Sequence, residues 1–216
     1  MKGNLLVKNG KNGSRSASLQ LSEGSIKRIL GINLFSGGDK HVNLVVPGYQ
    51  RGLYDYIAMI SISSITRQWI VDKMQKEANV SHFDFPPMFI EVPKGTSGRK
   101  PKDVSLFEFG RPGSKNPQHE VNMIVTFTGP VAYIRGITIY NKGNKWLIKV
   151  PGFRSTGGNT YGYVEFTQEF INWIIGVWEK EVLSGRKNVR GYYSIPEDHY
   201  RIAYRRTQSS LDGASI

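Results

Sequence analysis

Residues 131–153, VAYIRGITIYNKGNKWLIKVPGF, decide how this chain folds. Apolar and polar side chains alternate through residues 131–140 and again through residues 145–150. The Asn-Lys-Gly-Asn segment between the two runs supplies the residue types that tight turns require. Alternation with period 2 on both sides of such a turn predicts a long β-hairpin that ends at Pro151-Gly152. After a Gly-rich loop, an amphipathic pattern predicts a helix over residues 168–182.

The same pattern occurs earlier in the chain. Residues 29–35 match residues 134–140 in their apolar, Gly and aromatic positions. Four further pairs of motifs follow in the same order: Val46-Pro47-Gly48-Tyr49 with Val150-Pro151-Gly152-Phe153, Tyr54-Asp55-Tyr56 with Tyr161-Gly162-Tyr163, Trp69-Ile70 with Trp173-Ile174, and Lys76-Glu77 with Lys180-Glu181. The Val-Pro-Gly and Trp-Ile pairs are both offset by 104 residues (150 − 46 and 173 − 69). Five matched anchors favour a duplicated unit over chance similarity between two β-rich segments.

The predicted fold class is therefore α+β, with two tandem repeats. Each repeat is expected to form a roughly four-stranded antiparallel sheet followed by one α-helix, and the two repeats together a pseudo-two-fold single-chain dimer. The expected divisions are a first repeat (residues 1–80), a basic Pro/Gly linker (81–102), a second repeat (103–184) and a basic C-terminal tail rich in Tyr and Arg (185–216). Each repeat is long enough to bury a core of its own.

Local patterns place the remaining elements. Ser63 and Ser64 offer N-cap hydroxyl groups to the first helix. Trp69 and Trp173 lie on apolar helix faces and are expected in the core. The expected helices cover residues 65–79 and 168–182, and the expected strands cover residues 4–8, 16–21, 26–35, 41–46, 54–62, 88–92, 104–109, 121–128, 134–140 and 146–150.

The charge of the chain indicates its class of partner. Against 17 Asp and Glu residues stand 29 Lys and Arg residues, which gives a formal net charge of +12. A globular protein this basic typically binds a polyanion, most often nucleic acid and less often an anionic membrane. Because no apolar run of about 18 residues and no secretory leader is visible, we expect a cytosolic protein without membrane contact.

No catalytic or metal-binding motif is recognisable. The chain has no Cys, which excludes disulfides and thiolate zinc sites. Its four His residues lie far apart in the sequence and lack the spacing of metal ligands. Residues 157–159 resemble a phosphate-binding loop in composition alone, since no Gly-Lys-Ser/Thr follows. We expect a protein that is not an enzyme and holds no cofactor and no metal.

Cations and aromatic residues have the chemistry to bind nucleic acid. Lys and Arg neutralise phosphates, and exposed rings stack on unpaired bases. For Tyr54, Tyr56, Tyr161 and Tyr163 a core position and a stacking role remain equally open. The candidate binding residues are Lys40, Tyr49, Arg51, Arg67, Lys73, Arg99, Lys100, Lys102, Lys142, Lys145, Phe153, Arg154, Arg186, Lys187, Arg190, Tyr192, Tyr193, Arg201, Arg205 and Arg206.

The order of elements in the second repeat resembles the SpoVG family of bacterial regulators. The strand candidates beginning at Val104 and Val121, the hairpin over residues 134–150 and Pro151 follow the order of that family. Ile62-Ser63-Ser64-Ile65-Thr66-Arg67 is similar to the family's Ile-Asn-Ser-Ser-Thr-Arg at the helix start, with one residue inserted. A repeat of four strands and a helix is also similar to the PUR-repeat and Whirly single-strand binders.

These resemblances imply a small α+β fold that dimerises and binds DNA or RNA, here fused into one chain. Two positions depart from the SpoVG pattern. The family's third-strand Arg falls on Asn33 and Thr138, and its helix-start Arg is kept as Arg67 but replaced by Ile171 in the second repeat. The resemblance therefore implies unequal binding by the two halves.

The leading hypothesis is a non-enzymatic protein that binds single-stranded DNA or RNA. No recognition helix with basic residues clear of its apolar stripe is visible, which disfavours duplex binding. The first alternative is a phage-type inhibitor or regulator that presents its basic surface to an acidic protein partner. A homo-oligomeric structural or coat-type protein is the second alternative.

Overall fold

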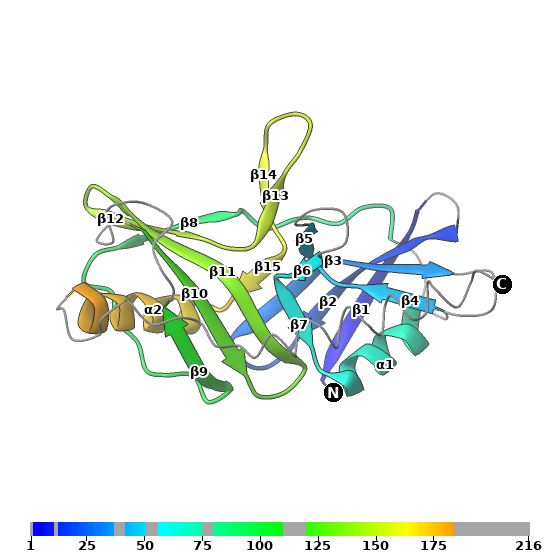
Figure 1. Ribbon diagram of the computed structural model, residues 1–216, viewed down its shortest axis with the longest axis horizontal. Helices are drawn as coiled ribbons and strands as arrows, with labels where there is room; N and C mark the ends of the chain where they lie inside the picture. Colours follow the sequence, from blue (N-terminus) through cyan, green and yellow to red (C-terminus); the bar gives the residue numbers. More distant parts are fainter. Residues whose placement is uncertain are drawn as a thin grey trace.

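The computed structural model describes residues 2–10, 13–36, 42–50, 56–74, 80–109 and 120–183. Within these residues, several antiparallel sheets and two α-helices form an α+β fold, as the sequence predicts. Figure 1 shows two large sheets side by side, with one helix beside each of them.

The first large sheet is built around the long strand β3. On one edge β3 pairs with β2, and β2 pairs in turn with β1. On its other edge β3 pairs with β4 and β15. The strands are β1 (Gly3–Asn9), β2 (Arg15–Leu21), β3 (Ile26–Ser36), β4 (Val42–Val45) and β15 (Val164–Phe166).

The second large sheet is built in the same way around the long strand β11. One edge of β11 pairs with β10, which pairs with β9, and the other edge pairs with β12 and β7. An additional strand, β8, pairs with the outer edge of β12. The strands are β7 (Ile60–Ile62), β8 (Phe89–Pro93), β9 (Val104–Phe109), β10 (Glu120–Phe127), β11 (Val131–Lys142) and β12 (Lys145–Lys149).

Each large sheet contains one strand from the other predicted repeat, where the first half of the chain means residues 1–80 and the second half residues 103–184. Strand β7 comes from the first half and pairs with β11 of the second half, with Ile60 opposite Ile134. Strand β15 comes from the second half and pairs with β3 of the first half, with Val164 opposite Ile29. The buried side chains of both halves accordingly form one hydrophobic cluster.

Two small hairpins, which we call arms, connect the large sheets to these crossing strands. The first arm consists of β5 (Gly48–Gln50) and β6 (Tyr56–Ala58), and the second of β13 (Gly152–Arg154) and β14 (Thr160–Gly162). The second arm projects from the body of the molecule in Figure 1.

The expectation of one strand over residues 54–62 is wrong. Residues 56–58 belong to the first arm, whereas residues 60–62 belong to the second large sheet. Met59 lies between them, with its N–H bonded to Pro47 O (2.9 Å) and its carbonyl bonded to Arg135 N (2.9 Å). The chain therefore leaves one sheet and enters another at this residue.

Both helices begin close to the predicted positions. Helix α1 (Ser64–Met74) starts after Ser63, whose Oγ accepts from Thr66 N (3.3 Å), and α2 (Gln168–Val177) starts after the equivalent cap, Thr167. A π-helical segment, Trp178–Leu183, continues α2. Trp173 is buried as expected, whereas Trp69 is half-buried against the core.

The predicted hairpins are confirmed, and so is the strand expected over residues 88–92 within the linker. Strands β11 and β12 pair across the predicted turn, as do β3 and β4. Within the linker expected over residues 81–102, β8 is a strand of the second large sheet, and Val92 is 2% exposed. This linker is therefore partly integrated into the fold.

Candidate nucleic-acid interface

Residues 94–102, here called the cationic strap, run from β8 across the surface of α2. Gly98 and Gly176 make this close crossing possible. A Cβ atom on Gly98 would lie 2.9 Å from Trp173 N, and one on Gly176 would lie 3.1 Å from the Cα atom of Ser97. Because those neighbours are backbone atoms, a larger residue at either position would push the strap away from the helix.

The Glu179 carboxylate fixes the start of the strap. It accepts hydrogen bonds from Gly95 N (2.9 Å) and from Trp146 Nε1 (2.6 Å). The Nζ atom of Lys94 lies 4.8 Å from the centre of the Trp146 ring, at a distance typical of a cation–π contact. Helix, sheet and strap are thus joined at one carboxylate.

Three cations of the strap remain available to a ligand. Arg99, Lys100 and Lys102 are exposed, and none of them has an ion-pair partner among the described residues. The Lys100 ammonium group donates only to a backbone carbonyl, Ser105 O, at 3.3 Å. The strap therefore presents unneutralised charge on a backbone that is held against a helix.

The hairpin lysines are engaged differently. Lys142 and Lys145 both form ion pairs with Glu91 of β8, at 2.8 Å in the case of Lys145. Hydrogen bonds from these two lysines lower the pKa of Glu91 to about 2. Part of the positive charge expected at this turn is consequently neutralised within the protein.

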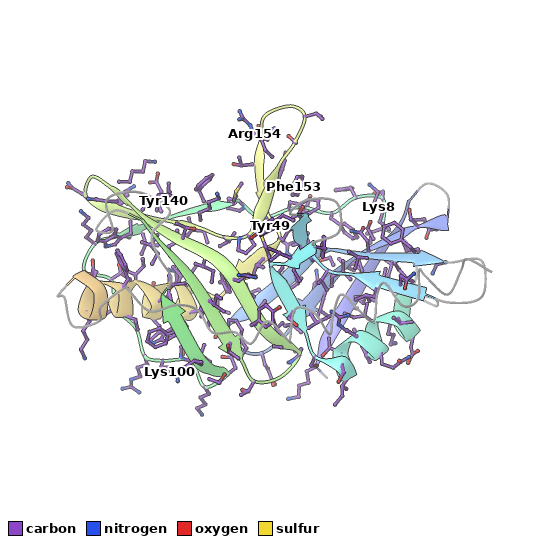
Figure 2. All side chains as sticks on the ribbon, in the orientation of Figure 1. Lys8, Tyr49, Lys100, Tyr140, Phe153 and Arg154 are labelled. Carbon is purple, nitrogen blue, oxygen red and sulfur yellow. The ribbon has the colours of Figure 1, made fainter. Side chains whose placement is uncertain are left out.

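The second arm carries aromatic residues and a cation. The Phe153 ring stacks on Tyr163 with a centroid distance of 5.2 Å, and it also contacts Tyr161 and Phe85. Arg154 is exposed, donates from Nε to Gly158 O (3.1 Å) and has no carboxylate partner among the described residues. The arm thus combines a ring cluster at its base with a charged residue further along the hairpin (Figure 2).

The first arm is more open. Tyr49, at the position of Phe153, is 48% exposed. Tyr56 is half-buried, and its hydroxyl donates to Val46 O. Burial and then the neighbouring Tyr163 raise the pKa of Tyr56 to about 12. Tyr49 is therefore the more accessible ring of the two.

The two candidate cations on helix α1 differ in exposure. Arg67 is half-buried, and its charge acts on Tyr133 in the second sheet. Burial raises the pKa of Tyr133, while Arg135, a hydrogen bond with Ser61 and Arg67 oppose that rise. Lys73 is exposed in the last turn of α1.

The described candidates do not form one group. Arg154 lies on the projecting arm in Figure 2, whereas Lys100 lies at the opposite, lower edge of the molecule. The strap, the β11–β12 turn and the arms are distinct locations. Ten predicted residues lie outside the described part of the chain: Lys40, Arg51, Arg186, Lys187, Arg190, Tyr192, Tyr193, Arg201, Arg205 and Arg206.

Sequence reasoning missed two half-buried rings beside the second arm. The ring centroids of Phe83 and Phe85 lie 6.5 Å apart, and those of Phe85 and Phe153 lie 5.1 Å apart. Phe83 and Phe85 are two residues apart, so in an extended segment their rings lie on the same side. This spacing is the feature of the sequence from which the pair could have been predicted.

A cleft of about 550 Å³ lies between the β2–β3 turn, the β10–β11 turn and the start of α2. Two of its carboxylates already have partners in the protein. Asp103 accepts from Ser25 N and Ser25 Oγ, both at 2.7 Å, and Glu23 pairs with Lys2 at 2.6 Å. Within the described ranges no three His, Cys, Asp or Glu side chains are grouped as metal ligands would be.

Comparison with family models, with curated proteins and with solved structures finds no match to this chain. Among the described residues, no helix has both the length and the apolar character needed to cross a membrane.

Proposed function

We propose that this protein is a non-enzymatic nucleic-acid-binding protein that prefers single strands of DNA or RNA. The observation that carries the proposal is the strap, with Arg99, Lys100 and Lys102 exposed and without ion-pair partners. Cations that meet phosphates release condensed counterions, which favours binding irrespective of base sequence. Because Gly95 and Gly98 hold the strap against the fold, little ordering of its backbone opposes binding.

The arms support a preference for single strands. Tyr49 is accessible, and Phe153 lies at the matching position of the second arm with Arg154 beside it. An unpaired base can stack on such rings, with a contribution of about 1–3 kcal/mol per base, whereas a duplex keeps its bases inside the helix.

We also propose that the two halves of the chain are copies of one unit that have exchanged strands. Three matched pairs of backbone hydrogen bonds support this. The bond from Leu30 N to Tyr163 O (2.8 Å) matches that from Arg135 N to Met59 O (2.9 Å), and the bond from Tyr163 N to Pro151 O (2.7 Å) matches that from Met59 N to Pro47 O (2.9 Å). The bond from Thr167 N to Ser25 O (2.9 Å) matches that from Ser63 N to Pro130 O (3.0 Å). The corresponding residues are offset by 104 or 105, so Tyr163 corresponds to Met59 and not to Tyr56, its partner in the motif match.

Two glycines add independent support for the duplication. Gly31 of β3 and Gly136 of β11 have φ of 73° and 79°, and each lies opposite a register irregularity in the neighbouring strand. A left-handed glycine at a bulge bends the strand, so both long strands bend at the same position. A pseudo-two-fold arrangement accounts for this match, and it is also what the resemblance to SpoVG implies.

Fluorescence anisotropy with labelled oligonucleotides tests the binding proposal. We expect the Arg99→Ala/Lys100→Ala/Lys102→Ala variant to bind a single strand at least about tenfold more weakly than wild type, because three phosphate contacts are lost. Lys142→Ala/Lys145→Ala is the matched control, since both lysines are already paired with Glu91. Equal weakening of the two variants would contradict the assignment of the strap.

The arms are tested with a second matched pair. Tyr49→Ala should reduce affinity for single strands, whereas Phe35→Ala should not, although Phe35 is equally exposed at 47%. Tighter binding to duplex than to single strands would contradict the stacking role. If neither nucleic acid binds while an acidic protein partner does, the alternative of a protein-interaction module replaces this proposal.

A further inference from the structure

The strap ends at a cleft that both halves of the chain line. Lys102, one of the three exposed cations of the strap, lines this cleft together with its neighbours Pro101 and Asp103. The other walls come from the β2–β3 turn of the first half and from the β10–β11 turn and the start of α2 in the second half. With a volume of about 550 Å³, the cleft is in the size range of ligand sites, which often lie where two units of a fold meet.

Asp103 joins the walls of the cleft. Its carboxylate accepts from Ser25 N and Ser25 Oγ in the β2–β3 turn, both at 2.7 Å. Its backbone carbonyl accepts from Thr128 N in the β10–β11 turn, also at 2.7 Å. Ser25 O in turn accepts from Thr167 N at the start of α2 (2.9 Å). Because the walls are already held together, little ordering of the protein opposes the entry of a ligand.

The lining of the cleft suits the flat faces of a nucleobase. Ile26, Phe127 and Val131 are buried residues of the core that line the cleft with apolar atoms. Pro101 and Pro130 add further apolar surface. A ligand held between such side chains is then recognised through its polar edge by the few polar groups of the site.

Of the three carboxylates that line the cleft, one keeps its acceptor oxygens available. Asp103 is bonded to Ser25, and Glu23 pairs with Lys2 at 2.6 Å. Glu169 is exposed and forms no ion pair or hydrogen bond with any other described residue. Because an ionised carboxylate accepts hydrogen bonds and donates none, Glu169 favours a base edge that carries donors.

Guanine is the base with the matching edge. Its N1–H and its N2 amino group are adjacent donors, so one carboxylate can accept from both of them. Adenine and cytosine have a ring nitrogen acceptor beside their amino group, and thymine and uracil have a carbonyl oxygen on each side of N3–H. In those four bases an acceptor would face the second carboxylate oxygen, which disfavours them.

We propose that the cleft binds one unpaired guanine of the single strand that lies along the strap. The Glu169 carboxylate accepts from guanine N1–H and N2, while Lys102 contacts a neighbouring phosphate. Arg99 and Lys100 bind further phosphates irrespective of the base, so the strap positions the strand and the cleft selects the base. This inference rests on the proposed binding of single strands and adds a base preference to it.

Fluorescence anisotropy with labelled thymidine oligonucleotides tests the guanine site. A strand with one central deoxyguanosine should bind the wild-type protein at least about fivefold more tightly than the all-thymidine strand. A central deoxyinosine, which lacks the N2 amino group, should recover only part of that gain. Equal affinity for the three strands would overturn the guanine site and leave binding by the strap intact, whereas failure of all three to bind would overturn both proposals.

Two variants test whether the preference arises in the cleft. Glu169→Ala should bind the all-thymidine strand at least as tightly as wild type, because a negative charge is removed, but should lose the preference for guanine. Thr128→Trp should lose the same preference, because an indole at this position fills the cleft. Asp72→Ala is the charge-matched control, since Asp72 is exposed on α1 and does not line the cleft. A guanine preference that persists in Glu169→Ala would overturn the proposal.

The other source of such a base is a free nucleotide, and competition separates the two. Guanosine monophosphate offers one phosphate to Lys102 and none to Arg99 and Lys100. It should therefore displace the labelled strand only at concentrations at least about tenfold above those of the unlabelled strand. Displacement at equal concentrations would overturn the assignment of the cleft to a base within a strand.

Discussion

Removal of the Glu179 carboxylate should destabilise the fold and release the strap. Glu179 accepts from Trp146 Nε1 at 2.6 Å, and Trp146 is 3% exposed, so Glu179→Ala leaves a buried indole N–H without a partner. An unsatisfied buried donor costs about 1–3 kcal/mol, and hydrogen bonds to a charged group lie at the upper end of the range. Gly95 N is exposed and regains water, so it adds little. We therefore expect a loss of about 2–3 kcal/mol in the free energy of unfolding.

Urea denaturation monitored by tryptophan fluorescence measures this loss. Glu169→Ala is the control, because Glu169 is exposed on α2, which leads into the segment of Glu179, and forms no ion pair or hydrogen bond in the described part of the chain. Its effect should stay within about 0.5 kcal/mol. Glu179→Gln keeps one acceptor for the indole and should fall between the two. If Glu179→Ala and Glu169→Ala unfold at the same urea concentration, the carboxylate does not hold the strap as described.

Three further outcomes are expected. Gly152→Ala should cost about 1–3 kcal/mol, because its Cβ would lie 2.1 Å from Tyr161 O, whereas Gly157→Ala should cost less because the nearest atom is 3.9 Å away. Hydrogen bonds from two lysines lower the pKa of Glu91 to about 2, so the stability that this carboxylate contributes is present above about pH 4.5 and is lost as the pH falls to 2. Glu91→Gln should therefore flatten the acid side of a profile of unfolding free energy against pH measured by urea denaturation. Burial raises the pKa of Tyr56 to about 12, so the stability contributed by its neutral phenol is present below pH 10 and is lost as the pH rises to 12. In the Tyr56→Phe variant this alkaline decrease in the unfolding free energy should be absent.

Local patterns predicted the local elements. The β11–β12 hairpin follows from alternation on both sides of Asn141-Lys142-Gly143-Asn144, and the start of α1 follows from the hydroxyl of Ser63. In both cases the information lies within a few consecutive residues. The matched motifs likewise align β3 with β11 from the sequence alone.

Pairings between distant residues were not predictable in this way. Strands β7 and β15 have only three residues each, too few to show a period, and their partners lie in the other half of the chain. The contact of Gly98 with α2 depends on two glycines that are 78 residues apart (176 − 98). Such contacts are decided by packing over the whole molecule.

The candidate site was predicted by composition and not by arrangement. The cations at residues 99–102 were expected and are exposed, whereas the partner that neutralises Lys142 and Lys145 was not foreseen. Glu91 lies about 50 residues away from both lysines in the sequence and meets them only because β8 pairs with β12.

The dependence of affinity on salt tests the central claim most directly. Each phosphate contact with a single strand contributes a slope of about −0.7 to a plot of log K against log salt concentration. Three contacts from the strap predict a wild-type slope of about −2 or steeper, and a slope about 2 units shallower in Arg99→Ala/Lys100→Ala/Lys102→Ala. No binding at low salt, or an affinity that stays constant as salt rises, would contradict the proposal that this protein binds nucleic acid through its cations.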